Sequence, residues 1–314
     1  MHGFSRLEKY QTPDEISYLF NNEDPENVWA EATDIVRRMS PGYDFILVQS
    51  VYEDVLRLFH GEYPGYCTVK TPYHDLSHTL EVFLCGLRLM HGVHVSGDHM
   101  ADDEITLVML ATLMHDVGYA QRRGEESGTG AQYTQTHVQR SVEFMQRHFF
   151  EIKNFPKLAD SLRDLISGTE DTQVFSRHDF SDDRIHMLGQ IVTTADLVGQ
   201  MADRIYLEKL LFLYLEFREA RFGNYRSMYD LLCKTNQFYK IVRVKLDGPL
   251  GGIYKKLAFH FKDTMGVGNN YYLEAIEKNM AYLAKIIAHD EAELFTMLRR
   301  NGIAKKIQTL IAPV

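Results

Sequence analysis

One stretch of the sequence decides the fold: DDEITLVMLATLMHDVG, residues 102–118. Its acidic start favours a helix, because negative side chains stabilise the positive end of the helix dipole. The apolar residues that follow predict a buried helix through Met114, which Gly118 ends. His115 and Asp116 close this apolar helix, so their polar groups need a buried partner. For this pair alone, the simpler interpretation is a helix-end histidine beside an aspartate cap.

The rest of the chain shows the same helical pattern. Apolar residues recur at three- and four-residue spacing, and sustained period-two alternation is missing, so we predict an all-α fold with essentially no sheet. Thr71 and Pro72 predict a helix start, as the N-cap and the first helical residue. The helical segment 184–221 is long enough that we expect a break near Gly199 or Asp203.

Composition narrows the class of protein. The chain has 314 residues, of which 45% are hydrophobic, which is enough for a substantial core. Acidic residues outnumber basic ones 43 to 34, so we expect no binding of duplex nucleic acid. The 3 cysteines lack disulfide or metal-finger spacing, which favours reduced thiols in a cytoplasmic protein. The longest apolar stretch, 105–114, is about half of the roughly 20 residues that span a membrane.

Two further residues extend the His115-Asp116 pair into a possible metal site. His78 precedes the apolar run Val82-Phe83-Leu84, and Asp196 lies in the apolar segment 191–201. A buried carboxylate at that point needs a strong partner, and an ion pair with an arginine such as Arg204 is the alternative to a metal. Two imidazoles and two carboxylates form a mixed nitrogen and oxygen site, which suits Zn, Fe, Mn, Ni or Mg. We expect one or two such divalent ions.

The order of these residues resembles a known superfamily. His78, then His115-Asp116, then Asp196, with these flanks, resembles the HD superfamily of metal-dependent phosphohydrolases. The phrase YHDLSHTLEV, residues 73–82, resembles the catalytic domain of the class I cyclic nucleotide phosphodiesterases. The resemblance covers roughly 73–221 and implies a compact, phosphodiesterase-like helical bundle. After the His-Asp pair the chain continues Val-Gly, as in the wider superfamily.

This interpretation divides the chain into three parts of one compact catalytic unit. Residues 1–40 are expected to form an N-terminal helical arm, residues 41–222 an HD-type metal-binding core, and residues 223–314 C-terminal helices packed on that core. The turn residues Pro41-Gly42 and Gly223-Asn224 mark the two boundaries.

Two residues are expected to carry the chemistry. A divalent cation lowers the pKa of bound water from about 15.7 to around 7, and Asp116 would bridge two cations and hold that water in line. His74 lies four residues before His78 and on the same helical face. Because imidazole titrates near neutral pH, and because the equivalent histidine of the phosphodiesterases protonates the leaving oxygen, His74 is the expected general acid.

Further residues are expected to contact a second metal or a phosphate, or to support the pocket around His74 and Asp116. The resemblance makes His137 a candidate contact for a second metal or a phosphate, and a structural histidine is the alternative. Arg122 and Arg123 are candidates to clamp a phosphate, although such a pair is often merely solvated. Thr169-Glu170-Asp171 takes the place of a Thr-Asp-Met phrase in the phosphodiesterases. The residues expected to support the pocket from behind the ligands are Asp75, Glu81, Gln200 and Glu170.

The function expected from these features is hydrolysis of a small phosphorylated substrate. A phosphodiester of a nucleotide or cyclic nucleotide is favoured. A nucleotide phosphomonoesterase or triphosphohydrolase of the same superfamily is an alternative, and so is a non-catalytic sensor that binds a metal or nucleotide. A helical bundle with coincidental His-Asp pairs is the structural alternative. The sequence does not predict the oligomeric state.

Overall fold

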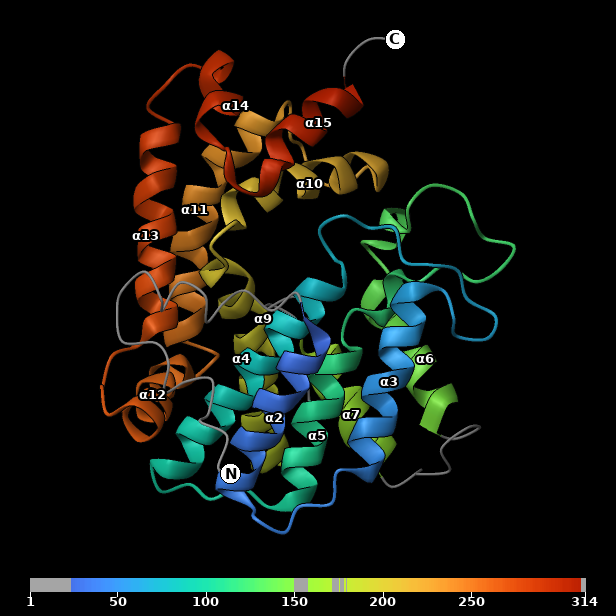
Figure 1. Cartoon of the computed structure of the whole chain (residues 1–314), viewed down its shortest axis with the longest axis vertical. Helices are drawn as coiled ribbons and strands as arrows, with labels where there is room; N and C mark the ends of the chain where they lie inside the picture. The colour runs from blue at the N-terminus through green and yellow to red at the C-terminus, as the bar shows by residue number, and fades with distance from the viewer. Residues whose placement is uncertain (1–23, 150–157, 171–174, 176–177, 179, 312–314) are drawn as a thin grey trace.

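The computed structural model describes these parts of the chain: residues 24–149, 158–170, 175, 178 and 180–311. Within them the secondary structure is helical, and the only β contact is one isolated antiparallel bridge between Tyr66 and Arg122. The predicted all-α class is therefore confirmed (Figure 1). The closer resemblance to a phosphodiesterase-like bundle stays a prediction.

The described α-helices follow one another along the chain. Their bounds are α2 Pro25–Met39, α3 Ile46–His60, α4 Leu76–Val95, α5 Asp102–Met114, α6 His137–Arg147, α7 Ala159–Ser167, α9 Asp183–Ala202, α10 Tyr206–Glu219, α11 Met228–Asp247, α12 Leu257–Met265, α13 Tyr271–Ile286, α14 Leu294–Met297 and α15 Ile303–Ile311. Short 3-10 turns connect several of them, including η3 Val117–Tyr119 and η4 Ala131–Tyr133.

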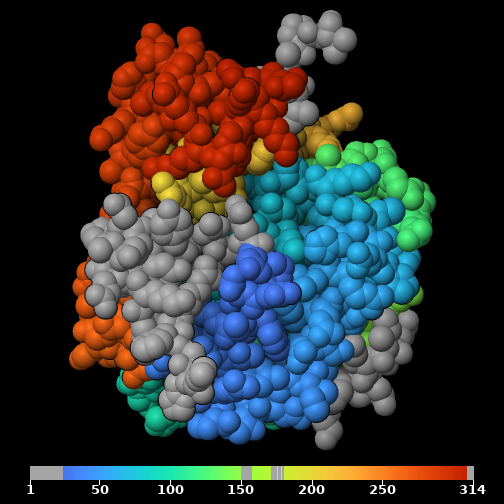
Figure 2. Space-filling view, in the orientation of Figure 1, coloured from blue at the N-terminus to red at the C-terminus, as the bar shows by residue number. Residues whose placement is uncertain are grey.

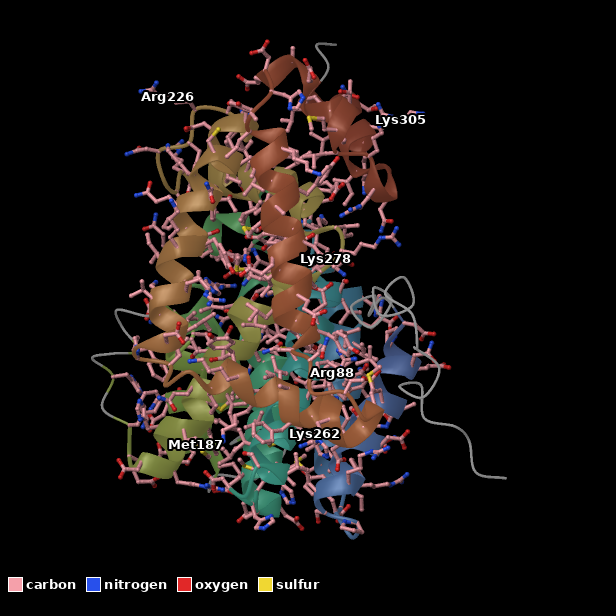
Figure 3. The ribbon with its side chains drawn as sticks, turned by 90° about the vertical axis from the view of Figure 1, so that its left-hand side faces the viewer. Arg88, Met187, Arg226, Lys262, Lys278 and Lys305 are labelled. Carbon is pink, nitrogen blue, oxygen red and sulfur yellow. The ribbon has the colours of Figure 1, made fainter. Side chains whose placement is uncertain are left out.

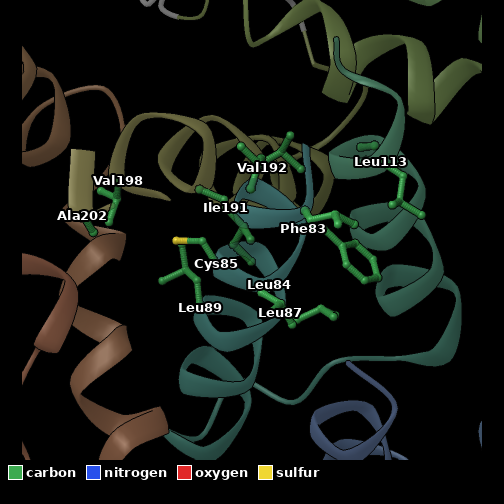
Figure 4. Packing of buried hydrophobic residues seen from close by; sticks show 14 of the residues in the cluster. Phe83, Leu84, Cys85, Leu87, Leu89, Leu113, Ile191, Val192, Val198 and Ala202 are labelled. Atoms are coloured by element: carbon green, nitrogen blue, oxygen red, sulfur yellow. The ribbon is translucent and has the colours of Figure 1, made fainter. Parts of the chain in front are cut away.

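Helix α4 is the centre of the bundle. It packs against α2, α5, α9 and α12, and almost its whole surface is buried. Figure 4 shows Leu84, Cys85 and Leu87 of α4 packed among residues of α9 such as Ile191 and Val192. A helix that is buried on every side is stable only when neighbours surround it, so the packing around α4 sets the places of the other helices.

The first described helix joins this core directly. Asp24 caps α2 by accepting from the backbone N–H of Glu26, and the apolar face of α2 packs on α4. The remainder of the predicted arm, residues 1–23, lies outside the described residues. The domain boundaries near residues 40 and 222 stay predictions. On the face in Figure 2, the C-terminal helices gather above the N-terminal and central ones.

The predicted break in segment 184–221 is confirmed. Helix α9 ends at Ala202 and α10 begins at Tyr206. Asp203 is buried at this corner, where its carboxylate accepts from the backbone N–H of Ile205 and pairs with Lys209 at 2.6 Å. The break turns α10 away from α9, which opens space over the middle of α9.

The predicted helix start at Thr71 and Pro72 is wrong. Helix α4 begins at Leu76, and Asp75 is its N-cap, accepting from the N–H of His78 at 2.9 Å. The hydroxyl of Thr71 instead donates to the carbonyl of His74 at 2.6 Å within a turn. Glu216, from a distant helix, accepts hydrogen bonds from the backbone N–H groups of Tyr73 and His74 and holds this segment out of the helix. His74 therefore lies before α4.

Two further features follow from the described residues. Cys67, Cys85 and Cys233 are free thiols, as the sequence predicts. Among the described helices, none combines the length and the apolar character that crossing a membrane requires.

Candidate metal centre

The four side chains singled out in the sequence converge at one point. His78 comes from the first turn of α4, His115 and Asp116 follow α5, and Asp196 comes from the middle of α9. His78 Nε2 lies 3.2 Å from Asp116 Oδ2 and 3.4 Å from Asp196 Oδ1. His115 Nε2 lies 3.3 Å and 3.8 Å from the same two oxygens. His78, His115 and Asp116 form a buried group whose ligand atoms all lie within 4.8 Å of one another, so it could hold a metal ion.

The hydrogen bond on the far side of His115 shows that this group fits a cation. His115 Nδ1 donates to the carbonyl of Thr112 at 2.9 Å, because a carbonyl can only accept. In the neutral ring Nε2 therefore carries no hydrogen and presents a lone pair, which accepts hydrogen bonds. It faces carboxylate oxygens, which also accept. Among the described residues this buried atom has no hydrogen-bond partner. Acceptors that face one another need a positive charge between them.

The pKa values of His78, His115 and Asp116 also indicate that this group needs a positive charge. Burial works to lower the pKa of His78, but Asp116 and Asp196 outweigh it and raise the pKa to about 10. Burial also works to lower the pKa of His115, and Asp116 again reverses the direction. Burial alone would raise the pKa of Asp116, yet His115 and His78 hold it well below its usual range. The Asp116 carboxylate therefore stays charged and attracts either protons on the histidines or a cation in their place.

His137 lies on the other side of Asp116. Its Nε2 is 3.4 Å from Asp116 Oδ1, while Asp116 Oδ2 faces His78 and His115, so the two carboxylate oxygens point at different histidines. His137 Nδ1 donates to the carbonyl of Thr134 at 2.7 Å, which again leaves Nε2 as a lone pair in the neutral ring. This is the arrangement expected of a carboxylate that bridges two cations.

A glycine permits this approach of α6 to the metal group. A Cβ on Gly118 would lie 1.9 Å from the carbonyl oxygen of His137, so any larger residue would push the start of α6 away. Arg140 then binds the carbonyl of Gly118 at 2.8 Å, and Ser141 accepts from its N–H at 2.9 Å. The predicted helix end at Gly118 is therefore wrong, because α5 ends at Met114 and Gly118 lies in the turn η3, where it sets the distance between Asp116 and His137.

His74 is held by a residue that the sequence did not reveal. Its Nδ1 lies 2.5 Å from Glu216 Oε2, and Glu216 Oε1 accepts from the backbone N–H groups of Tyr73, at 2.6 Å, and of His74, at 3.3 Å. Glu216 is 1% exposed on α10. These bonds keep the segment before α4 out of the helix. A buried carboxylate within apolar α10 was the only available signal, and its partner lies 142 positions away.

The ring of Tyr119 also restrains the His74 side chain. Tyr119 is stacked on His74 at 4.4 Å between centroids and on His137 at 4.6 Å. The three rings form one column beside Asp116. Tyr119 is buried, and burial holds its pKa well above the usual value, so its hydroxyl stays neutral.

The residues expected behind the ligands have different positions. Asp75 is the helix cap, and Gln200 donates to Asp196 Oδ1 at 3.3 Å while accepting from the Tyr73 hydroxyl at 2.5 Å. Glu81 turns away from the ligands and pairs with Lys209 at 2.8 Å. The described contacts of Asp196 are with histidines and Gln200, rather than with Arg204.

The loop arginines are not brought to the site. Arg122 and Arg123 are exposed and line no part of the cavity over the metal group. Arg122 is held in the bridge to Tyr66, and its guanidinium lies 4.0 Å from Glu143. Thr169 and Glu170 do line the cavity, whereas Asp171 lies outside the described residues.

The metal group forms one end of a cavity of about 350 Å³. The polar end is lined by His74, His78, Asp116, His137, Asp196 and Gln200. The opposite end is lined by Leu210, Leu213, Phe217, Phe222, Tyr225 and Phe238 of α10, α11 and the loop between them. Phe222 and Phe238 are 41% and 43% exposed at the rim. The cavity therefore offers a charged end and an aromatic end to one ligand.

Comparison with known protein families gives a match. A family described as Npun_R2479-like matches residues 121–246, a segment that includes His137, Asp196 and Glu216 but begins after Asp116. The description names no activity. No curated protein matches the chain. Over that segment the chain is similar to this family, and its chemistry has to be argued from the site.

Proposed function

We propose that this protein is a metal-dependent phosphohydrolase that cleaves a phosphodiester of a nucleotide or cyclic nucleotide. The observation that carries the proposal is the convergence of His78, His115, Asp116 and Asp196 at one buried point, beside a histidine that is oriented by a glutamate. Metal ligands and a proton donor in one cavity are the parts that phosphoester hydrolysis requires.

His78, His115, Asp116 and Asp196 would hold the first cation, and His137 with the second oxygen of Asp116 would hold another. The nitrogen and oxygen ligands suit Zn, Fe, Mn, Ni or Mg. A bound divalent cation supplies a water of lowered pKa and neutralises charge on the phosphoryl oxygens. Thr112 and Thr134 orient the two histidines through their carbonyls, so that Nε2 of each ring faces Asp116.

His74 is the proton donor in this proposal. Because Nδ1 donates to Glu216, the exchangeable proton is carried on Nε2 of the ring. Glu216 is a positioning residue, since its hydrogen bond with Nδ1 fixes the ring, and Tyr119 restrains the ring plane by stacking. His74 lines the same cavity as the metal group, with its ring near those of His78 and His137, so the leaving oxygen of a bound ester would lie beside it.

The aromatic end supports a nucleotide as the substrate. Phe217 and Tyr225 stack at 5.5 Å with an interplanar angle of 14°, and Phe222 packs against Phe217 at 5.1 Å. Such rings bind the flat face of a base by stacking. A small phosphorylated ligand with an aromatic group therefore matches both ends of the cavity.

The test is product analysis with the purified protein after loading with Mn, Zn, Ni, Fe or Mg. Cyclic AMP, cyclic dinucleotides, nucleoside monophosphates and nucleoside triphosphates would be supplied in parallel, with Asp116→Ala as the control. We expect cleavage of a diester in at least one metal. Release of inorganic phosphate without diester cleavage would overturn the proposed substrate in favour of a phosphomonoesterase. Tight nucleotide binding without turnover in any metal would indicate a sensor.

A further inference from the structure

A second cavity lies at the other end of α6 from the metal group. It has a volume of about 380 Å³, within the range of small-molecule sites. It lies between α3, the loop that follows α3, and the end of α6. His137 starts α6 at the first cavity, whereas His148 follows the last residue of α6 at the second, roughly 16 Å further along the helix axis. The two cavities share no lining residue.

The floor of the second cavity is aromatic and rigid. Tyr63 packs on Phe144 at 5.5 Å, and Tyr66 packs on the same ring at 5.4 Å. His148 is stacked on Phe144 at 5.8 Å, and its Nδ1 is hydrogen-bonded to the Tyr63 hydroxyl at 2.9 Å. All four side chains are buried apart from the faces toward the cavity. A flat ring can pack against this surface without rearranging it.

The rim of the cavity is cationic. Arg57 and Arg147 both line it, and both are exposed to solvent. Arg57 contacts Asp54, the one acidic residue of the lining, at 3.3 Å. A guanidinium has five N–H donors, so the contact of Arg57 with Asp54 leaves donors of Arg57 for a ligand. Arg122 adds a further positive charge beside the cavity through its hydrogen bond with Tyr66.

From these features we infer that the second cavity binds a small planar aromatic anion. Its ring would lie on Phe144 and the two tyrosines, and its carboxylate or phosphoryl group would lie between Arg57 and Arg147. Arginine suits such groups because it binds two of their oxygens at once. A neutral aromatic ligand would leave the charges unused, and an inorganic anion would leave the aromatic floor uncovered. This inference does not depend on the proposed function.

The probe is phenylphosphonate, whose carbon–phosphorus bond phosphoesterases do not cleave. Calorimetric titration into the full chain carrying Asp116→Ala, which disables the metal group, is expected to show one saturable site. The unmodified chain is expected to keep a site of the same affinity, because the metal group lies in the other cavity. Inorganic phosphate and benzyl alcohol, which each carry half of the probe, are expected to bind at least about tenfold more weakly. Equal binding of phosphate would overturn the inference.

Variants of the two arginines at the rim test whether phenylphosphonate binds in the second cavity. The double variant Arg57→Gln/Arg147→Gln is expected to weaken phenylphosphonate binding by about tenfold or more. Arg163→Gln is the matched control, because Arg163 is 44% exposed and pairs with an aspartate three residues earlier, as Arg57 does at 48% exposure. Phe144→Leu tests the floor separately and is also expected to weaken binding. Binding that survives these changes but is lost in Asp116→Ala would overturn the inference, as would the absence of saturable binding to the unmodified chain.

Discussion

Helix α4 carries two buried polar clusters that differ in one respect. Near its start, His78 meets Asp116 and Asp196, and further along Arg88 meets Glu31 and Tyr272. Arg88 is fully buried, and Figure 3 shows it among the helices, whereas Arg226 and Lys305 project at the periphery. Both clusters pay the cost of desolvation, but only one of them is complete by itself.

The difference is in the pairing of donors with acceptors. Arg88 Nε donates to Glu31 at 3.0 Å and Nη1 donates to the Tyr272 hydroxyl at 2.7 Å, so a positive group meets a negative one. In the other cluster the buried Nε2 atoms of His78 and His115 face carboxylate oxygens, so the rings must carry added protons or share a cation with them. The first cluster is therefore paired within the chain, and the second takes up either protons or an ion from outside. The predictions below separate these two roles.

The largest effect is expected for Asp116→Ala. This change removes the carboxylate that contacts three histidines, so the metal group loses its centre. We expect loss of stoichiometric metal and a fall in turnover by about four orders of magnitude. Elemental analysis and steady-state kinetics measure the two effects. Unchanged metal content would contradict the assignment of Asp116 as a ligand.

His74→Ala is expected to separate catalysis from metal binding. His74 contacts Glu216 and Tyr119, and no described metal-group carboxylate lies within ion-pair distance of it. We expect kcat to fall about a thousandfold while the metal content stays unchanged. Equal metal loss in His74→Ala and Asp116→Ala would show that His74 is a ligand instead.

Arg88→Ala is expected to act on stability alone. It leaves the Glu31 carboxylate buried without its main partner, which costs about 3–5 kcal/mol of unfolding free energy. Urea denaturation measures the loss, and the fraction that stays folded is expected to bind metal normally. Replacing both charges, as Arg88→Met/Glu31→Leu, is expected to recover most of the stability. If the double variant is as unstable as Arg88→Ala, the pair is not self-contained.

A buried histidine pair predicts a pH dependence outside the metal group. His91 Nδ1 and His260 Nδ1 are 3.1 Å apart between α4 and α12. Burial lowers the pKa of His91 to about 4, against the attraction of Asp263, and holds the pKa of His260 well below its usual value. The unfolded chain therefore takes up protons between about pH 6.5 and 4 that the folded chain does not, so stability falls as the pH falls through this window, by roughly 3 kcal/mol for His91.

Glu81 changes the stability in the opposite direction over part of this pH range. Burial raises its pKa to about 8, so its contribution increases as the pH falls. The measurement is therefore the difference in urea midpoint between pH 7 and pH 5, compared between the protein and His91→Leu/His260→Leu. We expect a smaller loss of stability on acidification in the variant. Equal losses would exclude the pair as a source of acid sensitivity.

The smallest effect is expected for Glu216→Gln. The amide keeps an acceptor for the backbone of Tyr73 and His74 but removes the negative charge beside His74 Nδ1. We expect kcat to fall about tenfold with KM and metal content unchanged, because His74 is oriented less firmly. A stability loss without any change in kcat would indicate a structural role only.

Much of the fold could be predicted because its signals are local. The acidic start and apolar run of 102–118 predict a helix that runs into His115-Asp116 and is ended by Gly118, and the structure contains this helix but ends α5 at Met114. The break at Asp203 was also local, because a short polar residue there satisfies the next backbone N–H groups. The wrong helix start at Thr71 shows the limit, since Glu216 outcompetes the local cap from a distant helix.

The sequence by itself determined the helical class, the helix ends around His115 and Asp203, and the residue types able to bind a cation. These depend on hydrogen bonds and apolar spacing over a few residues. Only the tertiary structure decided which side chains meet: Glu216 with His74, Glu81 with Lys209, and Arg122 with Tyr66 rather than with the metal group. Such pairings depend on how helices cross, which is set by packing around α4 and is not encoded in any single segment.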